Sequence, residues 1–318
     1  MQAVVVDPDA PGRLVLREFD PPVSLPNEAV VRVHAVSLNR GEVRRSHTTA
    51  PSGWRPGWDF AGVVKQEAAN GTGPKVGERV VGMLRSGAWA EQVAVGTEFL
   101  APLPDAVNFA QAATLPVAGL TALHALYRGG LLVGKSVLVT GATGGVGDFA
   151  IQLARLSGAT VTAHVRRPDQ ADFVTTAGAH HVAVGEDLAD AAKAFAPFDL
   201  IVESVGGAVL GAAMNLLAER GVCVSFGTSA GNDVTFDAQD FYFIGGASLY
   251  GLILFDELKW VETASAGLTR LAKLVESGAL KPQIALEDSW TNVANVAQQL
   301  LDRRFPGKAV LHVGAANG

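Results

Sequence analysis

The pattern of hydrophobic and polar residues changes twice along this chain of 318 residues. As far as about Leu115, short β-branched and apolar runs alternate with turns that are rich in Pro and Gly. This alternation predicts an all-β region built from short strands and tight turns. The predicted strands are Gln2–Val6, Arg13–Phe19, Ala29–Val36, Ala61–Gln66, Arg79–Met83 and Ala88–Val95.

From about Val117 to Leu254, apolar runs of strand length alternate with amphipathic runs of helical period. Strands and helices in alternation predict an α/β fold with a doubly wound parallel sheet. The predicted strands are Ser136–Thr140, Thr160–Val165, His181–Val184, Leu200–Glu203, Val222–Phe226 and Ser248–Leu252. The predicted helices between them are Gly145–Leu156, Leu188–Phe195 and Val209–Ala218.

After Asp256 the pattern changes again. It predicts a long helix at Glu257–Ser277, an extended run at Pro282–Leu286, a short helix at Val293–Asp302 and a last strand at Lys308–Val313. A tail of about 60 residues buries too little apolar surface to form a third independent unit. We therefore predict that residues 256–318 return to complete a domain formed by residues 1–116, and that residues 117–255 form a second domain inserted between them.

A glycine-rich turn carries the strongest chemical signal in the chain. It joins the strand Ser136–Thr140 to the helix Gly145–Leu156, and a second β-branched strand follows. Glycines allow a sharp turn and a close approach of the backbone to a pyrophosphate, whose charge then meets the free amides of the helix N-terminus. The order strand–turn–helix–strand predicts a dinucleotide-binding unit. The turn consists of Gly141, Ala142, Thr143, Gly144, Gly145, Val146 and Gly147.

Two arginines indicate which dinucleotide the unit prefers. Arg166 and Arg167 end the second strand, 19 and 20 positions after Gly147, where NAD-binding units usually carry an Asp or Glu for the ribose hydroxyls. A guanidinium binds a 2′-phosphate through charge-assisted hydrogen bonds, whereas a carboxylate would repel it. The pattern favours NADPH over NADH, and the alternative is that both arginines are solvated loop residues.

Composition excludes several other classes of protein. The net charge of −6 argues against a nucleic-acid partner, which a basic face would normally attract. No apolar run reaches the roughly 18 residues of a membrane span, and no secretory signal is visible at the start. Cys223, the single cysteine, allows no internal disulfide, and its apolar surroundings indicate a buried core residue. We expect a cytoplasmic protein.

Several short motifs follow one another along the chain: Asn39, Pro56–Val64 (PGWDFAGVV), Val76–Val80 (VGERV), Leu115–Ala122 (LPVAGLTA), the glycine turn and Gly307–Leu311 (GKAVL). Their order resembles the medium-chain dehydrogenase/reductase superfamily and, within it, the zinc-independent quinone oxidoreductase-like branch. The resemblance covers essentially the whole chain. It implies a GroES-like catalytic domain with an inserted Rossmann domain, and a homodimer joined through edge strands such as Ala247–Leu254. A strand buried inside one subunit explains that apolar run equally well.

The resemblance also implies that no catalytic zinc is bound. The positions that match the zinc ligands of metal-dependent members are Asn39, Trp58 and Val117, which do not form a ligand set. The seven histidines show no paired ligand spacing. Without zinc to stabilise an alkoxide, the chemistry shifts toward reduction of an acceptor that is already electrophilic.

The implied reaction is hydride transfer from NADPH to a quinone or to the β-carbon of an enone or enal. Asn39 is the first catalytic candidate, as an amide donor near the nicotinamide, and Arg44 is the second, unless it faces solvent. Trp54 and Trp58 are candidates for stacking on a flat substrate, unless they only pack under their loop. Asp59 is expected to be a structural partner for a nearby cation. Further cofactor contacts are implied at Thr121, Ser204, Val205, Phe226, Gly227, Thr228, Gly251 and Leu252.

Two other functions remain open at this point. One is a non-catalytic protein of the same fold that binds or senses NADPH. The other is an enoyl-thioester reductase, although the chain shows no basic patch for the phosphate of an acyl carrier.

Overall fold

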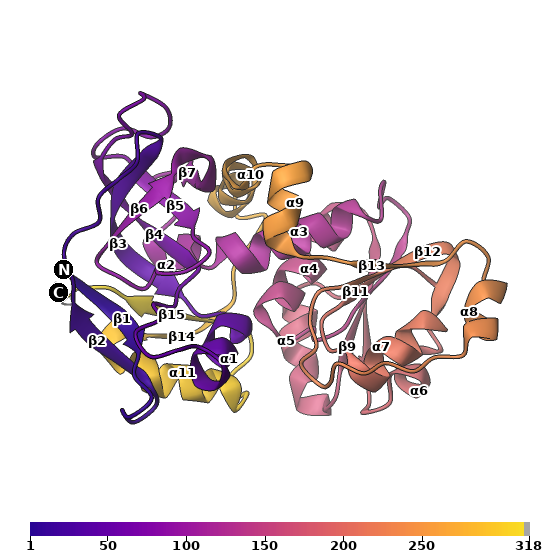
Figure 1. Ribbon diagram of the computed structural model, residues 1–318. Helices are drawn as coiled ribbons and strands as arrows, with labels where there is room; N and C mark the ends of the chain where they lie inside the picture. The colour runs from indigo at the N-terminus through magenta and orange to yellow at the C-terminus, as the bar shows by residue number, and fades with distance from the viewer. Residues whose placement is uncertain (315–318) are drawn as a thin grey trace. The chain divides into compact units, whose positions relative to one another are not determined.

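A computed structural model describes residues 1–314, and the chain divides into two compact units. The first unit comprises Met1–Leu120 together with the chain from Leu258 onward, and the second comprises Thr121–Glu257. Figure 1 shows the strands and helices of each unit. The unit boundaries lie within a few residues of the expected ones. Within residues 1–314, no helix is long and apolar enough to cross a membrane.

The second unit is built on a parallel sheet of six strands in the order β10-β9-β8-β11-β12-β13. Its direction of winding reverses between β8 and β11, and open α/β sheets bind ligands at such a switch point. The predicted doubly wound sheet is therefore confirmed. The strands are β8 (Ser136–Val139), β9 (Thr160–Val165), β10 (His181–Val184), β11 (Phe198–Glu203), β12 (Leu217–Ser225) and β13 (Ser248–Gly251).

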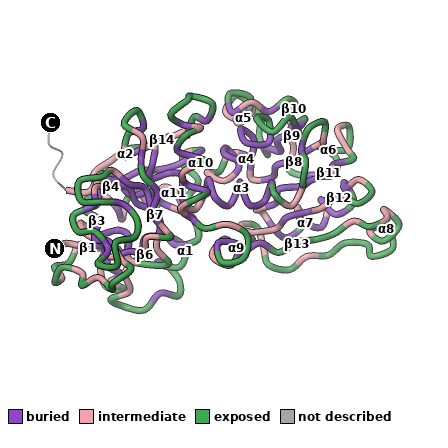
Figure 2. Tube along the Cα trace, turned by 90° about the horizontal axis from the view of Figure 1, so that it is seen from above, coloured by how far each residue is buried: buried purple, intermediate pink, exposed green. Residues whose placement is uncertain are grey.

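The central strands of this sheet are apolar on both faces because helices cover both faces. Val137, Leu138 and Val139 of β8 are fully buried, as is the run Leu200–Val202 of β11, and Figure 2 shows these strands in purple. The helices of the unit are α3 (Leu120–Tyr127), α4 (Gly145–Leu156), α5 (Ala171–Thr176), α6 (Leu188–Ala192), α7 (Gly207–Met214), α8 (Ala238–Phe243) and α9 (Leu254–Trp260), of which α3 and α9 run into the first unit.

The first unit contains a sheet of seven strands and a separate hairpin, β1-β2. The path β14-β15-β3-β4-β5-β7 is joined by β6, which pairs with β3. β15 runs antiparallel to β3, so the C-terminal segment lies in the same sheet as the N-terminal strands. The strands are β1 (Gln2–Val6), β2 (Leu14–Glu18), β3 (Glu28–Ser37), β4 (Asp59–Gln66), β5 (Arg79–Met83), β6 (Gln92–Gly96), β7 (Leu100–Pro102), β14 (Ile284–Ser289) and β15 (Lys308–His312).

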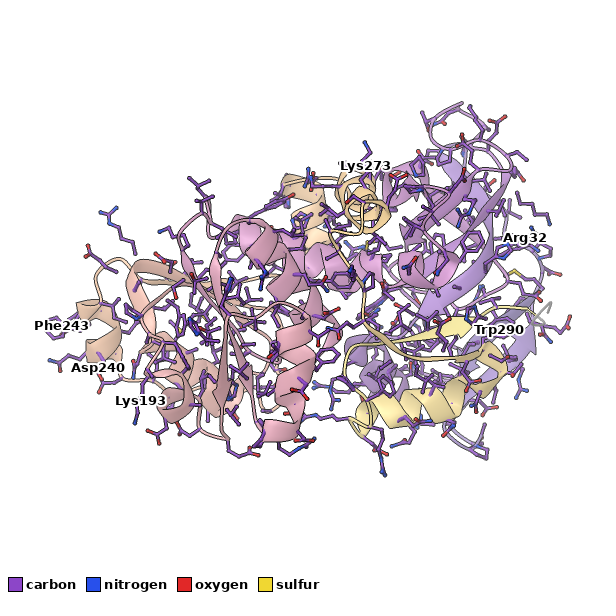
Figure 3. All side chains as sticks on the ribbon, turned by 180° about the vertical axis from the view of Figure 1, so that it is seen from behind. Arg32, Lys193, Asp240, Phe243, Lys273 and Trp290 are labelled. Carbon is purple, nitrogen blue, oxygen red and sulfur yellow. The ribbon has the colours of Figure 1, made fainter. Side chains whose placement is uncertain are left out.

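The helices of the first unit differ from the prediction at three places, because α1 (Arg40–Thr48) and α2 (Phe109–Ala113) lie in the region that was expected to be all-β, and the C-terminal helix is divided. The long helix expected at Glu257–Ser277 is wrong, because the chain forms α9 and then α10 (Ala264–Glu276). Thr263 between them has an extended backbone, and its Oγ1 accepts the Ala266 N–H at 3.3 Å as an N-cap. A separate core of the first unit includes Trp89 and Trp290; Figure 3 labels Trp290. The other helices here are α1 (Arg40–Thr48), α2 (Phe109–Ala113) and α11 (Val293–Leu301).

Candidate functional site

The glycine turn lies at the carboxyl end of β8, at the switch point of the parallel sheet. Gly141 has a φ of +56°, a conformation that side chains with a Cβ rarely adopt. A Cβ on Gly147 would lie 2.6 Å from the Gly141 carbonyl oxygen and 2.7 Å from the Ala142 Cα. Gly144 is the N-cap of α4 and supplies no side-chain hydrogen bond to the helix. The first turn of α4 therefore presents its amides to an anion, and the residues present fit a dinucleotide pyrophosphate.

Glu203 ties the ends of three neighbouring strands together. Its buried carboxylate accepts the backbone N–H groups of Val205 (2.6 Å) and Gly206 (3.0 Å) and the hydroxyls of Thr140 (3.2 Å) and Ser225 (3.4 Å). Burial raises the pKa of Glu203. The carboxylate fixes the loops that follow β8, β11 and β12, and this organising role was not predicted from the sequence.

The loops after β11 and β12 bring several predicted cofactor residues close to the glycine turn. The Ser204 Oγ donates to the Thr140 carbonyl oxygen at 3.4 Å, and a Cβ on Gly141 would collide with Ser204. A Cβ on Gly227 would lie 2.6 Å from the Ser204 carbonyl oxygen. Val205, Phe226 and Thr228 belong to these same two loops, and the Phe226 N–H donates to the Glu203 carbonyl oxygen.

The remaining predicted cofactor residues lie at other strand and helix ends. Gly251 ends β13, and the N–H of the buried Leu252 donates to the Ser225 carbonyl oxygen at 2.9 Å, next to the end of β12. Thr121 is 5% exposed in the first turn of α3. Ala142 is buried inside the glycine turn. The cofactor roles of these residues stay predictions.

The structure distinguishes the two arginines that follow β9. The Arg167 guanidinium pairs with Asp169, with Nε 3.1 Å from Oδ1, and this contact raises the pKa of Arg167. Arg166 is exposed, and within residues 1–314 its guanidinium has neither a hydrogen-bond partner nor an ion-pair partner. Arg166 is therefore the arginine that is free to meet a phosphate.

In the first unit, a buried charged cluster assembles four residues from distant parts of the sequence. We use the name Lys308 cluster for Asn39, Glu42, Asp59 and Lys308. Glu42 and Asp59 are 0% exposed and Lys308 is 3% exposed. The Lys308 Nζ donates to the Asn39 Oδ1 at 2.7 Å and to the Leu38 carbonyl oxygen at 3.0 Å, and it lies 3.5 Å from the Asp59 Oδ2. Lys308 is thus the cation that Asp59 was expected to meet.

Asn39 is placed in this cluster with its amide fully engaged. Its Nδ2 donates to the Asp59 Oδ2 at 2.7 Å and to the Glu42 Oε1 at 3.0 Å, while its Oδ1 faces the Lys308 ammonium. The opposite orientation would turn the oxygen toward two acceptors, the Asp59 Oδ2 and the Glu42 Oε1 that also accepts the Asn39 backbone N–H. Because an amide nitrogen has two hydrogens, none remains for a substrate carbonyl. The expected donation from Asn39 to substrate is therefore corrected: the amide orders the Lys308 cluster and keeps only acceptor capacity.

Glu42 was not predicted, although a local signal was present. Asn39 and Glu42 lie three residues apart at the start of α1, and the Glu42 Oε1 accepts the Asn39 backbone N–H at 2.8 Å. This is the spacing of a capping box. Burial and the neighbouring Asp59 carboxylate raise the pKa of Glu42 to about 8, against the partial compensation of Lys308 and Asn39. The second carboxyl oxygen of Glu42, Oε2, is buried without a hydrogen-bond partner.

This environment makes the stability of the first unit depend on pH. An unfolded Glu42 loses its proton near pH 4.5, whereas the folded one keeps it to about pH 8. The folded chain then binds more protons in this window, so this group lowers stability as the pH rises through it, by at most about 1.4 kcal/mol per pH unit. Glu42→Gln should remove that slope.

Urea unfolding between pH 5 and 8.5, followed by tryptophan fluorescence, measures the effect, because all five tryptophans lie in the first unit. The exposed Glu18 on β2 provides the control Glu18→Gln, whose stability should run parallel to that of the parent. A Glu42→Gln curve parallel to the parent would contradict the assigned protonation.

The other residues predicted to line the substrate cleft, Arg44, Trp54 and Trp58, lie on or near α1, and each has different neighbours. Arg44 is exposed on α1. The Trp58 Nε1 donates to the Arg85 carbonyl oxygen at 3.1 Å, and its ring lies against Gly41, where a Cβ would be 2.9 Å away. Trp54 packs against the core of the first unit, with the Arg45 guanidinium 4.7 Å from its ring centroid. Trp54 is thus held by packing and a cation–π contact, whereas Trp58 is half-buried next to the first turn of α1.

The positions that match zinc ligands do not fit a metal. Asn39 is committed to the Lys308 cluster, Trp58 offers an indole N–H that is already donated, and the Val117 N–H donates to the Asp59 Oδ1 at 3.0 Å. An ammonium, from Lys308, is the cation next to Asp59. Within residues 1–314, no group of three His, Cys, Asp or Glu side chains is arranged to hold a metal ion.

Comparison with known proteins agrees with this architecture. The model for the zinc-binding dehydrogenase family matches residues 145–270, and the model for the alcohol dehydrogenase GroES-like domain matches residues 25–105. Over 214 residues the chain is 35% identical to phthioceranic/hydroxyphthioceranic acid synthase of Mycobacterium tuberculosis, a match that covers 64% of this chain. The chain spans only about 10% of the length of that synthase.

Two further relatives match over most of their length. The chain is 29% identical to 2-methylene-furan-3-one reductase of Solanum lycopersicum, covering 90% of this chain and 72% of the reductase. The structure of the quinone oxidoreductase from Coxiella burnetii superposes with a TM-score of 0.82 at 27% identity, covering 99% of both chains. With both family models and the shared two-unit fold, the chain belongs to the medium-chain dehydrogenase/reductase superfamily.

Proposed function

We propose that the chain is a zinc-independent, NADPH-dependent oxidoreductase that transfers hydride to a quinone or an α,β-unsaturated carbonyl. The observation that carries the proposal is the Lys308 cluster, in which the amide of Asn39, one of the three positions that match zinc ligands, is bonded to the ammonium of Lys308. Without a metal to stabilise an alkoxide, an already conjugated acceptor is the better substrate. The names of the Solanum reductase and the Coxiella quinone oxidoreductase support the same acceptor class.

The nicotinamide cofactor supplies the hydride, and this chain's own residues position it. The turn from Gly141 to Gly147 and the first amides of α4 bind the pyrophosphate. The loop held by Glu203 fixes the backbone beside that turn. Asn39 orders the Lys308 cluster, and both of its amide hydrogens are engaged there.

Oxidation of NADPH followed at 340 nm, with a panel of small quinones and enones, tests the proposal. We expect steady turnover with both acceptor classes. Tight binding of NADPH without turnover on any acceptor would contradict it and favour a sensing protein. Enoyl thioesters form the third arm, because the 35% identical relative is an acid synthase. Turnover with thioesters well above that with quinones would favour the enoyl-thioester reductase instead.

The preference for NADPH is assigned to Arg166. We expect Arg166→Ala to raise the KM for NADPH by roughly 10-fold to 100-fold, because it removes charge-assisted hydrogen bonds worth about 1.5–3 kcal/mol. The KM for NADH should stay unchanged. Arg167→Ala is the matched control, since Arg167 is already paired with Asp169 and should have the smaller effect. Equal effects of Arg166→Ala on the two cofactors would refute the assignment.

We also propose that the protein is a cytoplasmic homodimer joined through β13. This strand is at the edge of its sheet, and an unpaired edge strand is a template for pairing with a second chain. Apolar side chains beside it are exposed: Leu249 by 46%, Tyr242 by 63%, Phe243 by 70% and Ile253 by 64%. Figure 3 shows Phe243 at the outer end of α8. Sedimentation of the parent chain should show a dimer, and Leu249→Lys should sediment as a monomer. A parent chain that sediments as a monomer would rule out the proposed dimer.

A further inference from the structure

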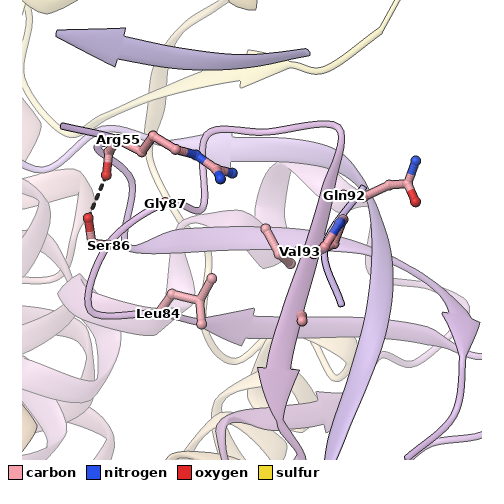
Figure 4. A pocket seen from close by; sticks show the side chains of 8 residues that line it. Arg55, Leu84, Ser86, Gly87, Gln92 and Val93 are labelled. Carbon is pink, nitrogen blue, oxygen red and sulfur yellow. Dashed lines mark hydrogen bonds between the residues drawn. The ribbon is translucent and has the colours of Figure 1, made fainter. Parts of the chain in front are cut away.

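The first unit contains a pocket that none of the residues discussed so far explains. Its volume is about 300 Å³. It opens between the loop that carries Arg55 and the strand β6, and Figure 4 shows it from close by. We call it the Arg55 pocket, and the lining residues used below are Pro22, Arg55, Leu84, Ser86, Gln92 and Val93.

Arg55 is a cation without an anion. Within residues 1–314, its guanidinium has neither a hydrogen-bond partner nor an ion-pair partner, and its Nε is buried from water. Burial lowers the pKa of Arg55. One face of the guanidinium lies 5.0 Å from the centroid of the Phe19 ring. A cation–π contact holds such a group in place, but it satisfies none of the N–H donors.

Burying a hydrogen-bond donor without a partner is costly, so the unpaired Nε–H of Arg55 requires an explanation. The loop that carries it is fixed rather than free. The Ser86 Oγ donates to the Arg55 carbonyl oxygen at 2.5 Å, and the Leu84 N–H donates to the Trp58 carbonyl oxygen at 2.8 Å. The cation is therefore held at the pocket by the fold of two neighbouring loops.

The rest of the pocket is an apolar wall. Pro22, Leu84 and the buried Val93 supply it. Gln92 adds no donor to this wall, because its side chain alternates with that of Val93 along β6 and its Oε1 accepts from the Lys65 Nζ at 3.0 Å. A planar guanidinium beside an apolar wall fits two oxygens on a short hydrocarbon.

We propose that the Arg55 pocket binds the carboxylate of a small apolar acid. The guanidinium of Arg55 pairs with the carboxylate, and the hydrocarbon lies against Leu84 and Val93. Binding here does not depend on the proposed reaction, because every lining residue belongs to the first unit, whereas the glycine turn belongs to the second.

Titration of the full chain with sodium butyrate at constant ionic strength tests the proposal, with the Arg55 Nε–H resonance in a proton–nitrogen NMR spectrum as the readout. We expect saturable binding that shifts this resonance. Butyramide has the same shape without the charge, so its affinity should be lower than that of butyrate by a factor on the order of ten or more. Equal binding of acid and amide would overturn the proposal, as would butyrate binding that leaves the Arg55 resonance unmoved.

Variants separate the charge from the fold. Arg55→Gln should weaken butyrate binding on the order of tenfold or more, measured by calorimetry, and Arg55→Lys should retain part of it. Arg304→Gln removes a 71% exposed arginine side chain of the same unit and should change nothing. If Arg55→Gln fails to fold, butyrate binding by Arg55→Lys is compared with that of the parent instead. An unchanged melting temperature of Arg55→Lys shows that this variant is folded. Butyrate binding by Arg55→Gln equal to the parent, or inorganic phosphate binding more tightly than butyrate, would overturn the carboxylate assignment.

Discussion

Replacing Lys308 by Met is expected to lower the free energy of unfolding of the first unit by about 3–5 kcal/mol, because it leaves the buried Asp59 carboxylate without a counter-ion. Asp59 is 0% exposed, and the Lys308 Nζ lies 3.5 Å from its Oδ2. The substitution also leaves the Asn39 Oδ1 and the Leu38 carbonyl oxygen without their donor. We expect the activity to fall together with the order of the Asn39 loop.

Urea unfolding at pH 7, followed by tryptophan fluorescence, measures this loss. Lys75→Met is the matched control, since it breaks an ion pair with Glu67 in the same unit whose side chains are 56% and 47% exposed. Such a surface pair contributes only about 0–1 kcal/mol. Adding Asp59→Asn to Lys308→Met should restore part of the stability by removing an unpaired buried charge. Equal losses for Lys308→Met and Lys75→Met would show that the Lys308 cluster is not held by its charge balance.

The second large effect is expected at Gly147. Its Cβ in Gly147→Ala would lie 2.6 Å from the Gly141 carbonyl oxygen and 2.7 Å from the Ala142 Cα, so either the turn or the start of α4 must move. Overpacking of this kind costs about 1–3 kcal/mol. If that cost falls on the arrangement that binds the pyrophosphate, NADPH affinity drops by about one to two orders of magnitude.

Calorimetric titration with NADPH measures the affinity, and far-UV circular dichroism verifies that the fold is retained. Gly231→Ala is the control in the same unit, because its nearest contact would be the Gly207 Cα at an ordinary 3.8 Å. NADPH binding by Gly147→Ala within about twofold of the parent, a difference of only about 0.4 kcal/mol, would mean that the turn does not cradle the cofactor.

Local patterns predicted most elements of the fold because their causes are local. The bounds of β1, β5, β9, β10 and α4 agree with the predicted ranges. Alternating apolar runs and turn residues act within a few positions of each other, and so does the glycine turn. The break between α9 and α10 was missed because helical periodicity continues across it, whereas the signal for a helix cap lies in a single residue, Thr263.

In the candidate site, too, the sequence located the features that depend on short spacing and missed those that depend on side-chain geometry. The turn at Gly141–Gly147 and the two arginines after β9 could be located by counting along the chain. The counting could not show that Asp169 engages Arg167 and leaves Arg166 free, since that depends on side-chain geometry. Likewise, the role expected for Asn39 assumed a free amide, and only the packed structure shows its hydrogens committed to Glu42 and Asp59.

The sequence by itself determined the superfamily, the parallel sheet and the place of the glycine turn, because those features depend on residue type, period and short spacing. Only the tertiary structure decided the chemistry of the first unit. Lys308 lies 269 positions from Asn39 along the chain, and β15 brings them together by pairing with β3. Burial then shifts the pKa values of the carboxyl and ammonium groups in this cluster. That effect arises only when the folded chain excludes water from them.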